Sequence, residues 1–160
     1  MHRPFLETRV LRDPSWWHWA ITVPLLAAHV LGLPWAIEAA LLLCAAMTLC
    51  YLLLMRSLQP FPVQVRLVYF GWLQVGLLPA MQWMHYIALV GTTAMVTVGY
   101  CPLGRMLALL WFNRTEPLTL SLLQRVLFSR PDGGLLYRRP MRETARPICS
   151  CSLESSNRVG

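Results

Sequence analysis

The sequence contains no lysine, and its 14 basic residues are all arginine. Charged residues of both signs make up only 13% of the chain, whereas soluble domains have about 25%. Between Asp13 and Arg56 the only charged residue is Glu38. Between Arg66 and Arg105 there is none. Apolar stretches of this length argue against a soluble enzyme and indicate segments that lie in lipid.

Motifs of known enzymatic chemistry are also missing. The sequence offers no Ser-His-Asp set, no Gly-rich phosphate loop and no paired catalytic carboxylates, so an enzyme is expected only in an unrecognised form. The net charge of +7 would suggest nucleic acid in a soluble protein. Here the arginines flank apolar runs and accompany no recognition module, so we expect contact with anionic lipid and none with nucleic acid.

The sequence contains several long hydrophobic runs, and these predict an all-α polytopic membrane protein with about four transmembrane helices. Residues 1–15 form a polar N-terminal segment that ends in a tryptophan cluster typical of a membrane interface. Within a transmembrane domain over residues 16–112, we expect spans at 16–33, 34–55, 65–80 and 82–101. The alternative for the first span, a cleaved signal peptide, lacks an Ala-x-Ala site.

The third span is short, and it reaches a bilayer's thickness only if Arg66 snorkels to the surface and the helix begins near Val63. After the spans, residues 118–128 would place leucines on one side of a helix and polar residues mostly on the other, which predicts an interfacial amphipathic helix at 113–130 on the cytoplasmic side. Residues 131–160 are rich in Arg, Pro, Gly and Ser and are expected to be disordered. Cys149 and Cys151 lie in this tail, where lipidation or a soft metal is the alternative to inert thiols.

The arginines predict the topology. Four crossings place the N-terminal segment, the 56–66 loop and the tail on one side, with 3, 2 and 9 arginines, and leave none in the two opposite turns. Because cytoplasmic loops carry the excess of arginine, both termini should be cytoplasmic in a bacterial inner membrane.

Two stripes of small residues at four-residue spacing predict close helix packing. They comprise Ala36, Ala40, Cys44 and Thr48 in the second span, and Thr93, Thr97 and Cys101 in the fourth. Packing within the chain and dimerisation through one stripe both remain open.

Ionisable residues inside a membrane are costly, which makes them candidates for function. His18 lies among tryptophans and is expected to be interfacial. His29, Glu38 and His85 all fall about 6 to 7 Å inside the external surface, counted at ~1.5 Å per residue from the turns. Two imidazoles and one carboxylate at one depth could bind a divalent metal or relay protons. A haem between His29 and His85 is a further alternative.

These residues also have a purely structural interpretation. Glu38 could simply face external water, while the two histidines hydrogen-bond to neighbours such as Tyr86 or Gln82. Equal depth does not determine whether these side chains point toward one another, because successive residues of a helix point in different directions, with ~3.6 residues per turn.

Residues 98–103 read Val-Gly-Tyr-Cys-Pro-Leu and follow an apolar hairpin that begins after Arg66. Over about residues 66–110 the chain thereby resembles the YgaP-type small inner-membrane hairpin family. The resemblance implies an inner-membrane protein and brings no catalytic residue. The chain departs from that pattern by an additional helical pair in front and a long arginine-rich tail behind.

The sequence therefore favours a non-enzymatic accessory or scaffold subunit that binds lipid and other membrane proteins or a second copy of itself. The alternative is a small transport or redox component with a metal or proton site near the external face.

Overall fold

A computed structural model describes residue 11, residues 13–110, residue 113 and residues 119–128. Within these residues the regular elements are helices, and no strand is present. They are α1 Pro14–Val30, α2 Pro34–Met55, α3 Phe61–Val75, the 3₁₀ turn η2 Pro79–Met81, α4 Trp83–Val98, α5 Pro102–Ala108 and α6 Leu120–Leu127. The all-α fold class predicted from the sequence is confirmed.

Prolines determine where most of the helices begin. A proline occupies the first turn of each of α1, α2, α3 and α5: Pro14, Pro34, Pro62 and Pro102. Proline suits this position because its φ is already helical and its missing N–H would have no partner in the first turn. At α1 the Asp13 carboxylate adds a cap by accepting a hydrogen bond from the Ser15 backbone N–H at 2.9 Å.

The helices differ from the expected spans mainly at their ends. α2 has the predicted bounds, but α1 stops at Val30 because Gly32, with φ of 98°, turns the chain into α2. α3 runs from Phe61 to Val75 rather than over 65–80, because Pro62 starts a helix where the sequence suggested a loop. The fourth helix ends at Val98, and α5 leaves it at an angle of 94°.

The predicted interfacial helix over 113–130 is represented by α6, whose bounds are Leu120–Leu127. Residues 114–118 and 129–130 lie outside the described residues, as do the tail over 131–160 and residues 1–10 of the N-terminal segment.

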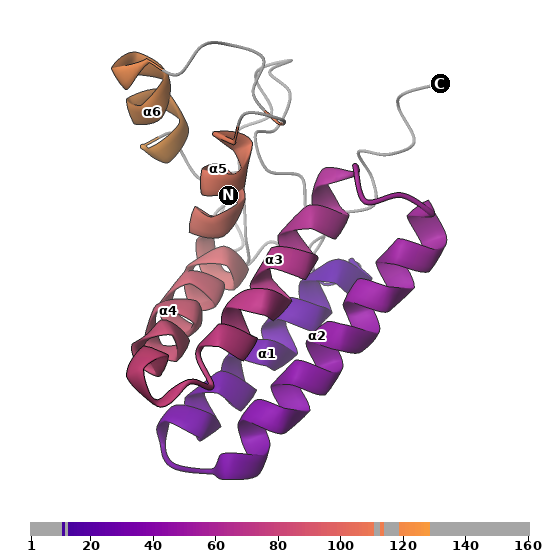
Figure 1. Cartoon of the computed structure of the whole chain (residues 1–160), viewed down its shortest axis with the longest axis vertical. Coiled ribbons are helices and arrows are strands. Elements are labelled where there is room, and N and C mark those ends of the chain that lie inside the picture. The colour runs from indigo at the N-terminus through magenta and orange to yellow at the C-terminus, as the bar shows by residue number, and fades with distance from the viewer. Residues whose placement is uncertain (1–10, 12, 111–112, 114–118, 129–160) are drawn as a thin grey trace, which may run out of the picture.

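The first four helices form a bundle in which neighbours run in alternating directions (Figure 1). α1 packs closely against α2 and α4, and α2 packs closely against α3. α3 and α4 touch much less, although they are consecutive in the chain. The turn between α1 and α2 and the turn between α3 and α4 lie at one end of the bundle, whereas α5 and α6 lie at the other (Figure 1).

The small-residue stripe of α2 faces the interior of the bundle. Ala36, Ala40, Cys44 and Thr48 are all buried. Small side chains there let α2 approach α1 and α3 closely. Packing within the chain is therefore what this stripe does. In the second stripe, Thr93 and Thr97 are half-buried and their hydroxyls donate to carbonyls of their own helix.

Large apolar side chains lie on the outside of the bundle as well as in its core, and several polar side chains are buried. Large apolar residues lie on the outside, among them Leu42 at 72% exposed and Val90 at 70%. The buried polar side chains are those of Ser15, His18, Thr22, Thr48, Arg66, His85, Thr92 and Arg105. An apolar exterior around a partly polar interior is the arrangement that lipid favours.

Of the described helices, α2 is long and apolar enough to cross a bilayer, with 22 residues and a mean hydropathy of 2.2. α4 and α5 also meet this condition if they are counted as one bent segment. α1 has 17 residues and α3 has 15, fewer than the ~20 of a usual span. α2 thus supports association with a membrane.

Candidate histidine site

His29 and His85 meet at the end of the bundle that carries the two short turns. His29 lies in the last turn of α1 and His85 in the first turn of α4. Nε2 of His29 is 3.2 Å from Nδ1 of His85, within hydrogen-bond distance. The two rings are nearly perpendicular, at 85°, with their centres 4.8 Å apart. The structure therefore joins two of the three candidates predicted from equal depth.

The orientation of the His85 ring is fixed by α3. Its Nε2 atom lies 3.0 Å from the carbonyl oxygen of Leu73. A carbonyl oxygen only accepts, so Nε2 of His85 carries the proton and, in the neutral ring, Nδ1 presents a lone pair toward His29. The Leu73 carbonyl is available because α3 is ending there, and the N–H of Leu77 bonds to the Gln74 carbonyl instead.

Gly76 allows the ring to occupy this position. A Cβ atom built on Gly76 would lie 2.5 Å from Nε2 and 2.7 Å from Cδ2 of His85. The imidazole thus rests directly on the backbone at the end of α3, and His85 is only 2% exposed. Sequence reasoning missed Gly76, because a glycine near a turn gave no indication that a ring packs on it.

His29 is less constrained than His85. Its side chain is half-buried. Its Nδ1 atom is buried and has no hydrogen-bond partner among the described residues. Since His85 Nδ1 accepts, Nε2 of His29 carries a proton in the neutral pair, and Nδ1 of His29 is left with a lone pair. The order of donation is therefore His29 to His85 to the Leu73 carbonyl.

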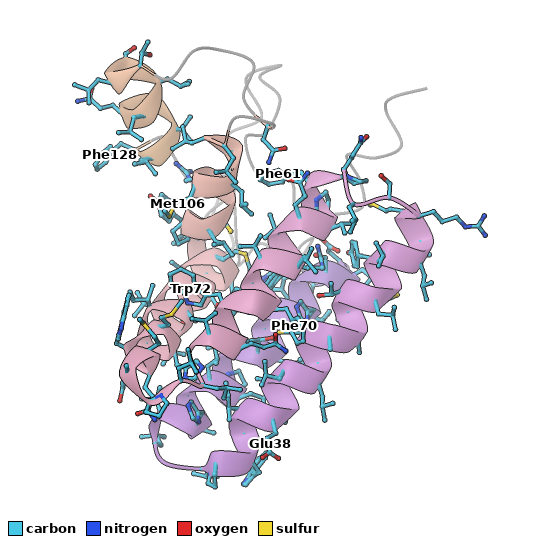
Figure 2. All side chains as sticks on the ribbon, in the orientation of Figure 1. Glu38, Phe61, Phe70, Trp72, Met106 and Phe128 are labelled. Carbon is cyan, nitrogen blue, oxygen red and sulfur yellow. The ribbon has the colours of Figure 1, made fainter. Side chains whose placement is uncertain are left out.

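Glu38 does not join the histidines. It is exposed and lies on the outer side of α2 (Figure 2). The reason is helix rotation, since Ala36 and Ala40, two residues to either side, face the interior and so turn Glu38 away from it. Among the described residues there is no group of three or more His, Cys, Asp or Glu side chains that could hold a metal ion.

A haem between His29 and His85 does not fit this geometry. Two axial imidazoles need their ligating nitrogens about 4 Å apart, twice a metal–nitrogen bond of about 2 Å. The observed 3.2 Å leaves no room for a porphyrin between the rings. The expected side-chain contacts of the histidines also differ, because the His85 ring bonds to the Leu73 carbonyl and to His29, and only the His85 backbone N–H bonds to Gln82.

Comparison of the chain with protein-family models, with curated proteins and with solved structures finds no match. The resemblance of residues 66–110 to the YgaP-type hairpin family therefore stays an expectation.

A second buried polar cluster surrounds Arg66 at the opposite end of α1. Arg66 is 1% exposed and donates hydrogen bonds to the Ser15 hydroxyl and, at 2.9 Å, to the Pro62 carbonyl. Its guanidinium also lies 3.6 Å from the centre of the Tyr51 ring. The condition that Arg66 snorkels to the surface is not met, because its side chain lies inside the bundle and its two terminal nitrogens donate hydrogen bonds there. The signal in the sequence was an isolated arginine in an apolar helix.

His18 belongs to the same end of the bundle. It is 3% exposed, and its ring lies against that of Trp19 at 4.6 Å between centres. It is therefore an interior residue of the bundle beside Trp19, and its position at the level of a membrane interface stays a prediction. Leu26, which is fully buried, lies between His18 and His29 along α1, so an apolar layer separates the two clusters.

Three cysteines lie among the described residues. Cys44 and Cys101 are buried and Cys50 is exposed. The Cys101 sulfur accepts a hydrogen bond from the Gly104 N–H at 3.2 Å and so caps α5. Cys149 and Cys151 lie outside the described residues.

Proposed function

We propose that the chain crosses a bacterial inner membrane four times, through α1 to α4, with both termini in the cytoplasm. All four helices carry exposed apolar residues, for example Ile21, Leu42, Val68 and Val90. The three shorter helices are accommodated by local thinning of the bilayer and by residues that flank the helices.

The arginine distribution supports the orientation. The turns at residues 31–33 and 76–82 contain no arginine. Arg56 and Arg105 belong to the opposite end of the bundle, where α2 ends and where α5 lies (Figure 1). Arginine on one side only is the pattern of a cytoplasmic face. A reporter active only outside the cytoplasm should be active after residue 33 or 81 and inactive after residue 58; activity after residue 58 contradicts the proposal.

Within this membrane, the function that the geometry supports best is a non-enzymatic accessory or scaffold subunit. The observation that carries it is the open side of the bundle, an apolar groove between α3 and α4 that α5 borders. Its lining includes Tyr69, Trp72, Ile87, Gly91, Met95 and Met106. Because α3 and α4 touch little, a helix of a membrane partner can pack there on small and aromatic side chains.

Site-specific crosslinking in cells tests this function. In one variant a photoreactive residue replaces Ile87, which lines the open side. In the matched control it replaces Leu42, which is exposed on α2. Discrete adducts from position 87 alone, lost when Gly91→Trp fills the groove, are expected. Equal adducts from both positions contradict a partner at the open side, and an adduct of twice the chain's mass identifies a second copy as the partner.

The contact between His29 and His85 favours a second function, a small transport or redox component that binds a proton or a metal ion near the external face. Two hydrogen-bonded imidazoles can take up one proton, because the cation that forms still donates to its neutral neighbour. In proteoliposomes, proton or Zn²⁺ flux should be present with the wild type and lost with His29→Gln. Absence of both fluxes in the wild type contradicts transport by this pair.

A further inference from the structure

We infer that His29 Nε2 and His85 Nδ1 together chelate one divalent first-row transition-metal ion, without Glu38, and that Gly76 is the positioning residue of this site. The inference rests on the second proposed function and specifies its ligand. Two aromatic nitrogens are soft enough to prefer Cu²⁺, Ni²⁺ or Zn²⁺ over Mg²⁺ or Ca²⁺, which require oxygen ligands.

The spacing of the two nitrogens suits a metal ion. Two metal–nitrogen bonds of 2.0–2.1 Å at a tetrahedral angle place the nitrogens about 3.3 Å apart. The observed separation is 3.2 Å. The separation of the two nitrogens is therefore close to that of a chelate, and binding requires the rings to turn so that both lone pairs point at the ion rather than along the line between the nitrogens.

The surroundings of His85 are those of a metal ligand. Ligating histidines usually donate their other N–H to a carboxylate, a backbone carbonyl or water, which fixes the tautomer. His85 donates from Nε2 to the Leu73 carbonyl, so the Nδ1 lone pair is set toward His29 before any metal arrives. Gly76 holds the ring from a second side, since any Cβ at this position would collide with it.

His29 can adopt the tautomer that chelation needs. For Nε2 of His29 to bind metal, its proton must move to Nδ1. No neighbour among the described residues holds Nδ1, so this change breaks no hydrogen bond other than the one between the two rings. The remaining coordination positions fall to water or to an external ligand. An ion with open positions is suited to transfer or exchange rather than to a closed structural role.

Cu²⁺ is the sharpest probe, because it binds nitrogen ligands most tightly in the first-row series. The full-length protein is purified in mild detergent with Cys149→Ser and Cys151→Ser, so that the tail thiols cannot compete. Electron paramagnetic resonance then counts the nitrogens on bound Cu²⁺. One ion per chain with two imidazole nitrogens is expected at neutral pH.

Four variants make the test specific. His29→Gln, which keeps an N–H donor for His85, should abolish the two-nitrogen signal. Gly76→Ala should weaken binding about tenfold or more by displacing His85. Gly71→Ala, where nothing lies within 4 Å of the new Cβ, is its matched control and should bind as the wild type does, as should Glu38→Gln.

Three results would overturn the inference: no Cu²⁺ bound by the wild type, an unchanged two-nitrogen signal in His29→Gln, or equal losses in Gly76→Ala and Gly71→Ala. Loss of affinity in Glu38→Gln would refute the part that excludes Glu38. Failure here is distinct from failure of the proposed function. Proton flux that depends on His29 in proteoliposomes, without a Cu²⁺ site, would leave the transport proposal standing and remove only the metal.

Discussion

The guanidinium carbon of Arg66 lies 3.6 Å from the centre of the Tyr51 ring, and both side chains are buried between α2 and α3. A cation over an aromatic face away from water contributes about 2 kcal/mol or more. The Tyr51 hydroxyl is buried and has no hydrogen-bond partner among the described residues. The ring of Tyr51, rather than its hydroxyl, is thus what stabilises the buried charge.

Variants of Tyr51 should separate these two contributions. Tyr51→Phe keeps the ring and removes an unpaired hydroxyl, so the free energy of unfolding should stay unchanged or rise slightly. Tyr51→Leu should lower it by about 2 kcal/mol, because the cation loses its aromatic face. Thermal unfolding in detergent measures both.

A tyrosine with a bonded hydroxyl provides the control for this comparison. The Tyr69 hydroxyl is 2.7 Å from that of Thr92, so Tyr69→Phe should cost about 1 kcal/mol. Equal destabilisation by Tyr51→Phe and Tyr51→Leu would show that the hydroxyl matters and the cation contact does not.

Close packing in the stripe of α2 makes Cys44 sensitive to size. Cys44 is 2% exposed, whereas Cys50 on the same helix is exposed. Cys44→Leu should push α2 away from α1 and lower the free energy of unfolding by about 1–3 kcal/mol. Cys50→Leu, on the exposed side of α2, should leave it nearly unchanged. If Cys50→Leu is the more damaging variant, the assigned inner face of α2 is wrong.

Much of the fold could be predicted from the sequence because hydrophobic runs and prolines act locally. The bounds of α2 follow from Pro34 and a long apolar run with a single charged residue, Glu38. The start of α3 could not be predicted in the same way, because Pro60 and Pro62 are equally compatible with a loop and with a helix N-terminus. The loose contact between α3 and α4 depends on tertiary packing, which no local pattern encodes.

The candidate site was only partly predictable for a related reason. Counting residues from the turns gives height along a helix, and it placed His29 and His85 together. It does not give rotation about the helix axis, so Glu38 was included although it faces outward. The contact between Gly76 and His85 depends on where two helices end relative to each other, which the sequence does not reveal.

Gly76 should be the least replaceable of the glycines in α3 and its C-terminal cap. Gly76→Ala places a methyl group against the His85 ring and should break the bond from His85 to the Leu73 carbonyl, at a cost of about 1–3 kcal/mol. The methyl group of Gly71→Ala would meet no atom within 4 Å, and alanine favours the helix interior over glycine. This variant should therefore be neutral or stabilising by up to about 1 kcal/mol. The midpoint of thermal unfolding should be lower for Gly76→Ala than for Gly71→Ala. The reverse order would exclude the packing of the His85 ring on Gly76.

Arg105 should hold α6 in place. It is 1% exposed, donates to the Val126 carbonyl at 2.8 Å and stacks on Tyr100, whose hydroxyl donates to the Leu127 carbonyl at 2.7 Å. The Arg105 guanidinium and the Tyr100 hydroxyl thus donate to the last carbonyls of α6. Carbonyls at a helix C-terminus lack a partner N–H within the helix, so these two side chains supply it. Arg105→Ala should therefore release α6 while leaving the four-helix bundle folded.

Thiol labelling measures this release. In a chain whose native cysteines are replaced by alanine, a cysteine at position 126, which is 8% exposed, should react slowly with a water-soluble maleimide. Arg105→Ala should raise its rate several-fold. A cysteine at position 120, which is 73% exposed, should react rapidly with or without Arg105. An unchanged rate at position 126 in Arg105→Ala would mean that apolar contacts alone keep α6 on α5.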